Sequence, residues 1–321
     1  MISQSNVDFS VPTPLGRKQV ICVLNETGNL NSENIQEACS GEGETKAAWT
    51  RVHSIIDAVW KSRTRQNPKL FNKSKFRLLS LNVEEEQTPQ YSKVRLELGL
   101  TDYKTYLGTN CISDDNRFSE ICSLGEQVFN NPRGFLADSL GVGAVVLVSH
   151  SEARQNPEII LIRRSLSTGE YQGFLDLPGG HPEPDRLIQA NSSQDLTNEL
   201  FFSISDEVCA EVNIPLVDLT EPRLFALVRQ PGQSHDKPSC LFVIESTLTK
   251  SQILELYLQG GEEAEESTDI IFCKLNDVIN EHSASSSSYD GILLTPQATF
   301  ALQWLRHATE TQTYTVGSTG Y

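Results

Sequence analysis

Two glutamates one helical turn apart, Glu207 and Glu211, are the residues of this sequence whose type and spacing most directly suggest chemistry. They lie in the segment DEVCAEVNI, residues 206–214, just before Pro215. Like charges at positions i and i+4 weaken an isolated helix by about 0.3 kcal/mol, so helix stability does not explain the pair. A divalent cation reverses the sign of that interaction, and Mg²⁺ prefers one or two carboxylates completed by water and substrate phosphates. An ordinary solvated helix face is the alternative.

A helix over residues 195–212 is expected to carry the pair. Its apolar positions recur every four residues and form a stripe that packs against a sheet: Leu200, Ile204, Val208 and Val212. Each glutamate is rotated about 100° from this stripe, at its margin. Gly180 stands 27 residues before Glu207, in LDLPGGHPEP. A Gly-Gly pair lets backbone atoms approach a ligand closely because no Cβ blocks them.

The strand, the Gly-Gly turn and this helix together resemble the Nudix box, G-x5-E-x7-R-E-U-x-E-E-x-G-U, in which U is aliphatic. In that register Glu207 matches the first helical glutamate and Glu211 the last. Twelve residues are inserted between the glycine and the helix, Asp206 replaces the arginine, and Ala210 replaces the middle glutamate. Glu183 and Glu199 are alternatives for the loop glutamate. Asn213 replaces the box glycine without harm, since asparagine also adopts the left-handed conformation that ends a helix.

Segments along residues 45–275 are similar, in the same order, to the animal UDP-glucose pyrophosphatase branch of the Nudix superfamily, including SKFRLLS, LELGLTDYKTYLGTN and ELFFSISDEVCAEVNIPL. That branch itself carries the long insertion and the degenerate box. The resemblance implies Mg²⁺-dependent hydrolysis of UDP-glucose, and of UDP-galactose, to UMP and the sugar 1-phosphate. It also implies that Glu207 and Glu211 are catalytic metal ligands.

The other candidate site residues lie outside the helix. For a general base we select Glu266, in the acidic segment GGEEAEESTDIIF; Glu262 and Glu263 are interpreted as solvated neighbours, and a mechanism without a dedicated base remains the alternative. Arg164, at the end of EIILIRR, is preferred over Arg163 as a ligand of the diphosphate. Gly180 is expected to approach the substrate, and His181 either contacts phosphate or caps the turn.

Uracil recognition needs an aromatic or apolar platform with hydrogen-bonding groups beside it. The segment LGLTDYKTYLGTN offers Tyr103 and Asn110, which we select, and Tyr106. Aromatic residues at positions i and i+3 of a helix are also common in a protein core.

The elements that must position these residues form two groups. Before residue 138, a helix is expected at 47–65, a hairpin at 75–83 and 92–100, and a short helix at 102–107, followed by the polar stretch CISDDNRFSE and a turn at NNPRG. From Leu140, short apolar strands alternate with helices at 195–212, 251–259 and 295–307, the last capped by Thr295. We therefore predict an α/β protein. A small α+β module for uridine recognition (1–137) precedes a Nudix α/β/α sandwich around a mixed sheet (138–308), and a flexible tail (309–321) follows it.

Composition limits the partners. A net charge of −16 argues against a nucleic-acid partner, because phosphate-backbone binding depends on clustered Lys and Arg. The seven cysteines are scattered singly, which favours a reducing compartment. No targeting segment or membrane span is recognisable, so we expect a cytosolic or nuclear protein without a membrane partner.

Two other functions remain open from the sequence. One is hydrolysis of another nucleoside diphosphate compound such as ADP-ribose, because the catalytic helix acts on the diphosphate and not on the base. The other is a nucleotide-sugar sensor without turnover, suggested by the box positions that hold Asp206 and Ala210.

Overall fold

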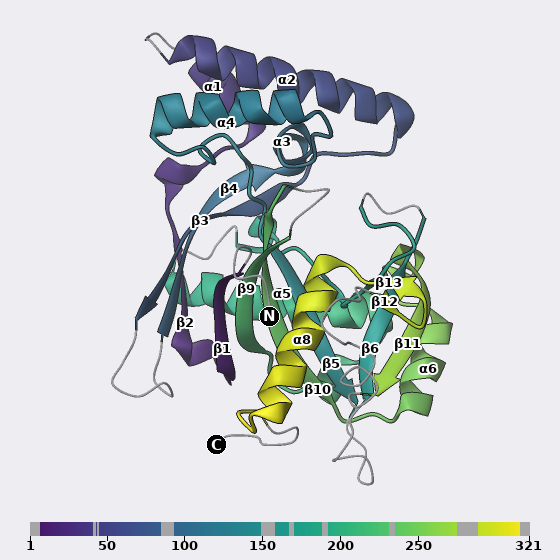
Figure 1. The fold of residues 1–321 in the computed structure, drawn as a ribbon. Helices are drawn as coiled ribbons and strands as arrows, with labels where there is room; N and C mark the ends of the chain where they lie inside the picture. The colour runs from purple at the N-terminus through teal and green to yellow at the C-terminus, as the bar shows by residue number, and fades with distance from the viewer. Residues whose placement is uncertain are drawn as a thin grey trace.

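The computed structural model describes residues 7–40, 43, 45–84, 93–148, 158–166, 170–187, 192–230, 235–274 and 288–314. Within these residues, two larger sheets and one two-stranded hairpin organise the chain (Figure 1). Among the described residues no helix is long and apolar enough to cross a membrane.

The large sheet has eight strands and is mixed, as predicted. Across it lie β1 (Val7–Leu15), β9 (Arg223–Gln230), β10 (Lys237–Ser246), β5 (Gly141–Val148), β6 (Glu158–Arg164) and β11 (Ser267–Lys274). Two short strands extend it: β7 (Leu175–Asp176) pairs with β6, and β8 (Gly179–Gly180) pairs with β5. β10 and β5 are parallel, whereas the other pairs are antiparallel.

Helices cover both faces of this sheet, which confirms the predicted α/β/α sandwich. Alternate residues of β5 point to opposite faces: Val146 packs in one core with α5 (Ser193–Val212) and α6 (Lys250–Gln259), and Val145 packs in another with α8 (Pro296–Glu310). The predicted stripe of α5, from Leu200 to Val212, is at most 1% exposed. A small hairpin, β12 (Ser288–Tyr289) and β13 (Ile292–Leu293), precedes α8.

The smaller sheet belongs to the predicted N-terminal module, and its order is β2 (Val20–Leu24), β4 (Lys93–Asp102) and β3 (Ser74–Glu84). Above it lie α1 (Ser32–Ser40), α2 (Lys46–Gln66), α3 (Tyr103–Gly108) and α4 (Asp115–Phe129), as Figure 1 shows. Leu96 and Leu98 of β4 share the core of α5. The backbone N–H of Cys22 donates to the Thr197 hydroxyl of α5 at 3.0 Å. The module therefore packs directly on α5.

Several elements differ from the prediction. The polar stretch at 111–120 enters helix α4, whose start Asp114 caps through its carboxylate. The strand β1 joins the edge of the large sheet, although it belongs to the predicted module. Of the predicted tail 309–321, residues 315–321 lie outside the described residues; α8 continues to Glu310, residues 311–313 are exposed, and Tyr314 is 7% exposed and donates to Glu245 at 3.2 Å.

Candidate functional site

The Gly-Gly turn and α5 lie against each other through the two glutamates. The N–H of Gly179 donates to Glu211 Oε2 at 2.8 Å, and the N–H of His181 donates to Glu207 Oε1 at 3.0 Å. A Cβ at position 180 would lie 2.1 Å from Glu207 Oε1, so only glycine allows the carboxylate to lie against the backbone there. The sequence-predicted residues Gly180, Glu207 and Glu211 are therefore brought together.

Glu211 is buried and Glu207 is half-buried, which makes their negative charge costly. Burial, followed by the charge of Glu263, raises the pKa of Glu207 to about 8. Burial and then the charge of Glu207 raise the pKa of Glu211 well above its ordinary range. Two like charges in such surroundings are stabilised by a cation between or beside them.

Glu263 lies nearer to the pair than the sequence suggested. The turn before β11 packs on α5, where the N–H of Glu263 donates to the Ala210 carbonyl oxygen at 3.2 Å. The Glu263 carboxyl group is half-buried and lies within hydrogen-bonding reach of Glu207. Glu266, the predicted base, is exposed, and its charge raises the pKa of both box glutamates. The interpretation of Glu263 as a solvated neighbour was wrong.

Gly261 explains how this turn comes so close to the backbone of α5 at Ala210. A Cβ at Gly261 would lie 2.2 Å from the Ala210 carbonyl oxygen, so the turn sits directly on the helix backbone. In the Nudix box this helix position carries a glutamate. Here the helix has only a methyl group at that position, and a carboxyl group from a distant segment lies beside Glu207 instead.

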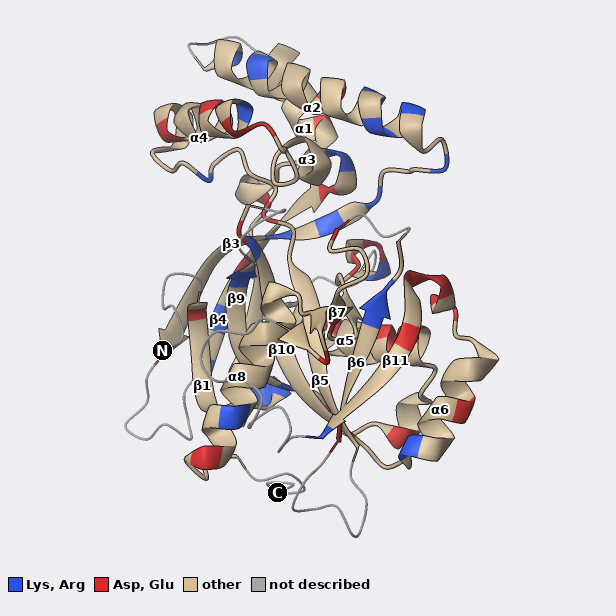
Figure 2. Ribbon diagram, turned by 45° about the vertical axis from the view of Figure 1, so that its right-hand side comes forward, with Lys and Arg blue, Asp and Glu red and all other residues tan. Residues whose placement is uncertain are grey.

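Positive side chains from two strands, β6 and β3, act on the glutamates. Arg164, at the end of β6, donates to Asp176 Oδ2 at 3.1 Å and to the Glu170 carbonyl oxygen at 3.0 Å, and its charge acts on Glu211. Burial lowers the pKa of Lys75 in β3 to about 8; the nearby charges of Lys237 and Lys73 lower it further, and that of Glu207 opposes the shift. In Figure 2 the basic end of β6 lies near the acidic turn before β11.

Lys237 joins the two parts of the molecule. This residue begins β10 and is 8% exposed, and its Nζ lies 5.6 Å from the centre of the Tyr106 ring in the module. Burial lowers its pKa, whereas the charge of Glu170 opposes that shift. Neither Lys75 nor Lys237 was found from the sequence, because no local pattern distinguishes a lysine that faces a site from one that faces solvent.

The residues predicted to bind uridine differ in their burial and in their hydrogen bonds. Tyr103 is half-buried, and its ring is stacked with that of Tyr106 at a centroid distance of 6.4 Å. Tyr106 is 4% exposed and donates to the Glu170 carboxylate at 3.1 Å. Asn110 is fully buried: its Nδ2 donates to Asp138 Oδ1 at 3.0 Å, and its Oδ1 accepts the Asp138 N–H at 3.0 Å. Asn110 therefore braces the module and offers no amide to a base.

His181 is neutral in this position. Burial, followed by the positive charge of Lys237, lowers its pKa well below the usual range. Its Nε2 is buried without a hydrogen-bond partner among the described residues, and its backbone N–H is the group that holds Glu207.

The donor set fits a hard divalent cation. Among the described residues, no group of three or more His, Cys, Asp or Glu side chains is arranged to hold a metal ion by itself. Two carboxylates are sufficient for Mg²⁺, which retains water and binds substrate phosphates. The desolvated pair Glu207 and Glu211 meets that requirement.

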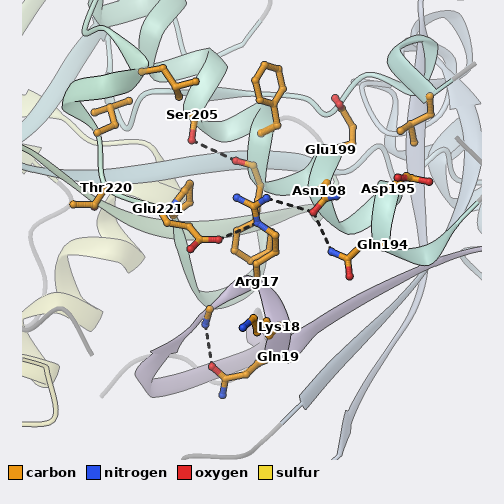
Figure 3. A pocket seen from close by; sticks show the side chains of 17 residues that line it. Arg17, Lys18, Gln19, Gln194, Asp195, Asn198, Glu199, Ser205, Thr220 and Glu221 are labelled. Atoms are coloured by element: carbon orange, nitrogen blue, oxygen red, sulfur yellow. Dashed lines mark hydrogen bonds and ion pairs between the residues drawn. The ribbon is translucent and has the colours of Figure 1, made fainter. Parts of the chain in front are cut away.

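A separate cavity of about 1160 Å³ lies beside another part of α5 (Figure 3). Arg17 lies in it, 3.0 Å from Glu221 and 5.7 Å from the centre of the Phe201 ring. Asn198, which also lines it, is nine residues before Glu207, so about 100° per residue places it on the opposite side of the helix. This cavity therefore lies away from the paired carboxylates.

The sandwich and the paired carboxylates beneath a Gly-Gly turn together define a hydrolase of the Nudix type. No family model matches the chain. The uridine diphosphate glucose pyrophosphatase NUDT22 of Homo sapiens is 36% identical over 260 residues, 78% of this chain and 81% of that protein. The Bos taurus protein of the same name is 37% identical, covering 68% of this chain and 73% of its own length. Nudix hydrolase 9 of Arabidopsis thaliana is 32% identical, covering 71% and 73%.

This chain belongs to the Nudix hydrolases and is an enzyme. Nudix hydrolases generally use a divalent metal ion, in agreement with the donor set of α5.

Proposed function

We propose that this enzyme is a Mg²⁺-dependent UDP-sugar diphosphatase, which hydrolyses UDP-glucose, and also UDP-galactose, to UMP and the hexose 1-phosphate. The observation that carries the proposal is that half-buried Glu207 and buried Glu211 lie against the Gly-Gly turn, where the positive charge of Lys75 acts on Glu207 and that of Arg164 on Glu211. The two carboxylates would hold a cation, and the cation and the basic side chains would together offset the charge of a diphosphate. The names of the relatives support the choice of UDP-glucose.

In this reaction water attacks one phosphorus atom, the P–O–P bond breaks, and the leaving phosphate takes the electron pair. Glu207 and Glu211 would hold the Mg²⁺ ion, which would supply positive charge against the diphosphate and make the attacking water more acidic. Arg164 and Lys237 are donors to the phosphate oxygens, where charge develops as the bond breaks. Lys75 adds positive charge from the module side.

A carboxylate that accepts the proton of the attacking water must lie near the pair. We propose Glu263 for this role, because its carboxyl group lies beside Glu207. Glu266, in the same turn, is the second candidate. The Glu263→Gln and Glu266→Gln variants distinguish them, because loss of the base lowers kcat and shifts the acid limb of the pH profile.

For the uridine, we propose that Tyr103 is the platform. Its ring is half-buried beside Tyr106, close to the lysine that joins both parts of the molecule. The module before residue 138 would then choose the nucleotide, and the sandwich would hydrolyse the diphosphate. We further propose a cytosolic or nuclear enzyme without a nucleic-acid partner, in keeping with its net charge of −16.

The test is release of UMP from a panel of nucleoside diphosphate sugars and ADP-ribose, with Mg²⁺ and with EDTA. We expect turnover of UDP-glucose and UDP-galactose only with the metal. Faster turnover of ADP-ribose than of either UDP-sugar would show that the proposed substrate is wrong. Tight binding without turnover would instead indicate a sensor.

A further inference from the structure

The Nudix box places two residues of opposite charge at fixed positions, and this chain holds both charges in reverse. The pattern has a glutamate six residues after the glycine and an arginine directly before the first helical glutamate. Counted from Gly180 and from Glu207, these positions are Arg186 and Asp206. The acidic position has become basic and the basic position acidic.

The structure brings the two residues together despite the insertion between them. Arg186 Nη2 lies 2.6 Å from Asp206 Oδ2. The guanidinium carbon also lies 5.4 Å from the centre of the Phe202 ring on α5. Arg186 Nε is 3.6 Å from Glu183 and its Nη1 is 3.9 Å from Glu199, the two residues considered as replacements for the loop glutamate.

This contact is the last of a series that joins the Gly-Gly segment to α5. Gly179 and His181 donate their N–H groups to Glu211 and Glu207, and Glu183 donates its own to Glu199 at 3.3 Å. Arg186 then binds Asp206, the residue next to Glu207. Movement of the segment at Arg186 therefore changes the backbone that orients the Glu207 carboxylate.

We propose that Arg186 and Asp206 form a charge-reversed equivalent of the box pair, and that they position the Gly-Gly segment against the catalytic helix. Both are positioning residues, acting through the His181 N–H and the Glu207 carboxylate. The inference rests on the proposed hydrolysis at Glu207 and Glu211, but not on the identity of the sugar or base.

Because the pair is exposed, its effect on the reaction rate can be distinguished from its effect on the stability of the fold. The two side chains are 36% and 41% exposed, and ion pairs at such positions contribute little to stability. A slight displacement near the reacting groups can cost about a hundredfold in rate. A positioning pair is therefore expected to change kcat much more than melting temperature.

The experiment reverses the charges at positions 186 and 206 one at a time and then together, which restores the charges of the Nudix pattern. Arg186→Glu and Asp206→Arg each place like charges together and are expected to lower kcat by about tenfold to a hundredfold. The double variant, with glutamate at 186 and arginine at 206, is expected to regain kcat to within about threefold of wild type. All variants are assayed on whichever nucleoside diphosphate compound the wild type hydrolyses fastest. If UDP-glucose is not the substrate, the wild-type measurements show it, and the comparison among variants is unaffected.

A second readout does not involve catalysis. Hydrogen exchange at the Gly179 and His181 amides of the metal-free protein is expected to accelerate in each single variant and to slow again in the double variant. The control is the exchange of charges between Arg51 and Glu120, a bidentate pair at 2.6 and 2.8 Å on α2 and α4, with exposures of 52% and 36%. It should leave kcat and both amides unchanged.

Three outcomes overturn the proposal. They are single variants with wild-type kcat, a double variant as slow as the singles, and single variants whose loss of activity follows an equal loss of folded protein in thermal melting.

Discussion

The N-terminal module and the large sheet region contribute different groups to one place. The sheet region provides all the carboxylates of the proposed reaction, on α5 and on the turn before β11. The module provides Lys75 from β3 and the stacked pair Tyr103 and Tyr106 from α3. Lys237 connects them, because it begins β10 but lies over a tyrosine of the module. If the proposed function is correct, hydrolysis and nucleotide choice reside in different parts of the chain and can be changed separately.

The largest effect should come from the sheet region alone. Glu211→Gln keeps size and helix propensity but removes an anionic oxygen ligand, so we expect kcat to fall by more than about a hundredfold. Mg²⁺ titrations of activity measure the loss. Glu262→Gln, on the exposed acidic turn, is the matched control and should be nearly silent. Equal losses of activity in both variants would mean that the total negative charge near the site, and not the metal-ligand pair, determines the rate.

Substitution of Lys237, which lies between the module and the large sheet, should have an intermediate effect on activity. Lys237→Met retains the apolar stem and removes a phosphate donor, so kcat/KM should fall by about tenfold to a hundredfold. Lys250→Met is the control, because Lys250 is exposed on α6 and also lies over an aromatic ring, at 4.9 Å from Phe272. If the two substitutions behaved alike, the junction would have no part in the reaction.

A substitution in the module should change substrate binding more than turnover. Tyr103→Ala removes the proposed platform for uracil, and stacking of about 1 kcal/mol corresponds to a rise in KM of roughly fivefold with little change in kcat. Kinetics with UDP-glucose and an ADP-sugar measure the selectivity. Unchanged discrimination between the two would exclude Tyr103 from nucleotide choice.

The smallest expected effect concerns stability and pH. The folded-state pKa of Glu207, about 8, lies above its unfolded value, so the folded state holds this proton more tightly. Stability is therefore lost as pH rises from the unfolded pKa towards 8, because the unfolded chain releases the proton first. Metal-free Glu207→Gln should lose less melting temperature than wild type between pH 5.5 and pH 8, by about a few degrees. Identical slopes would show that Glu207 is not strained without metal.

Local periodicity was sufficient for the elements with a strong apolar pattern. The stripe of α5, the helix α2, the β3–β4 hairpin and the Thr295 cap of α8 all follow from side-chain spacing. β1, β2, α1 and α4 were not predicted, and the reason is identifiable for β1 and α4. β1 contains Pro12 and Pro14, which are tolerated because it is an edge strand. Within α4 only Ile121 and Gly125 are buried, so its apolar pattern is weak.

The sequence by itself determined the paired glutamates, the Gly-Gly turn and the helix that presents them, because all three depend on short-range spacing. Only the tertiary structure decided which other charges join them. Lys75, Lys237 and Glu263 come from β3, β10 and the turn before β11, and Arg186 meets Asp206 across an insertion. Sheet pairing and the packing of the module on α5 set these contacts. A side chain's partners across such distances leave no periodic trace in the chain.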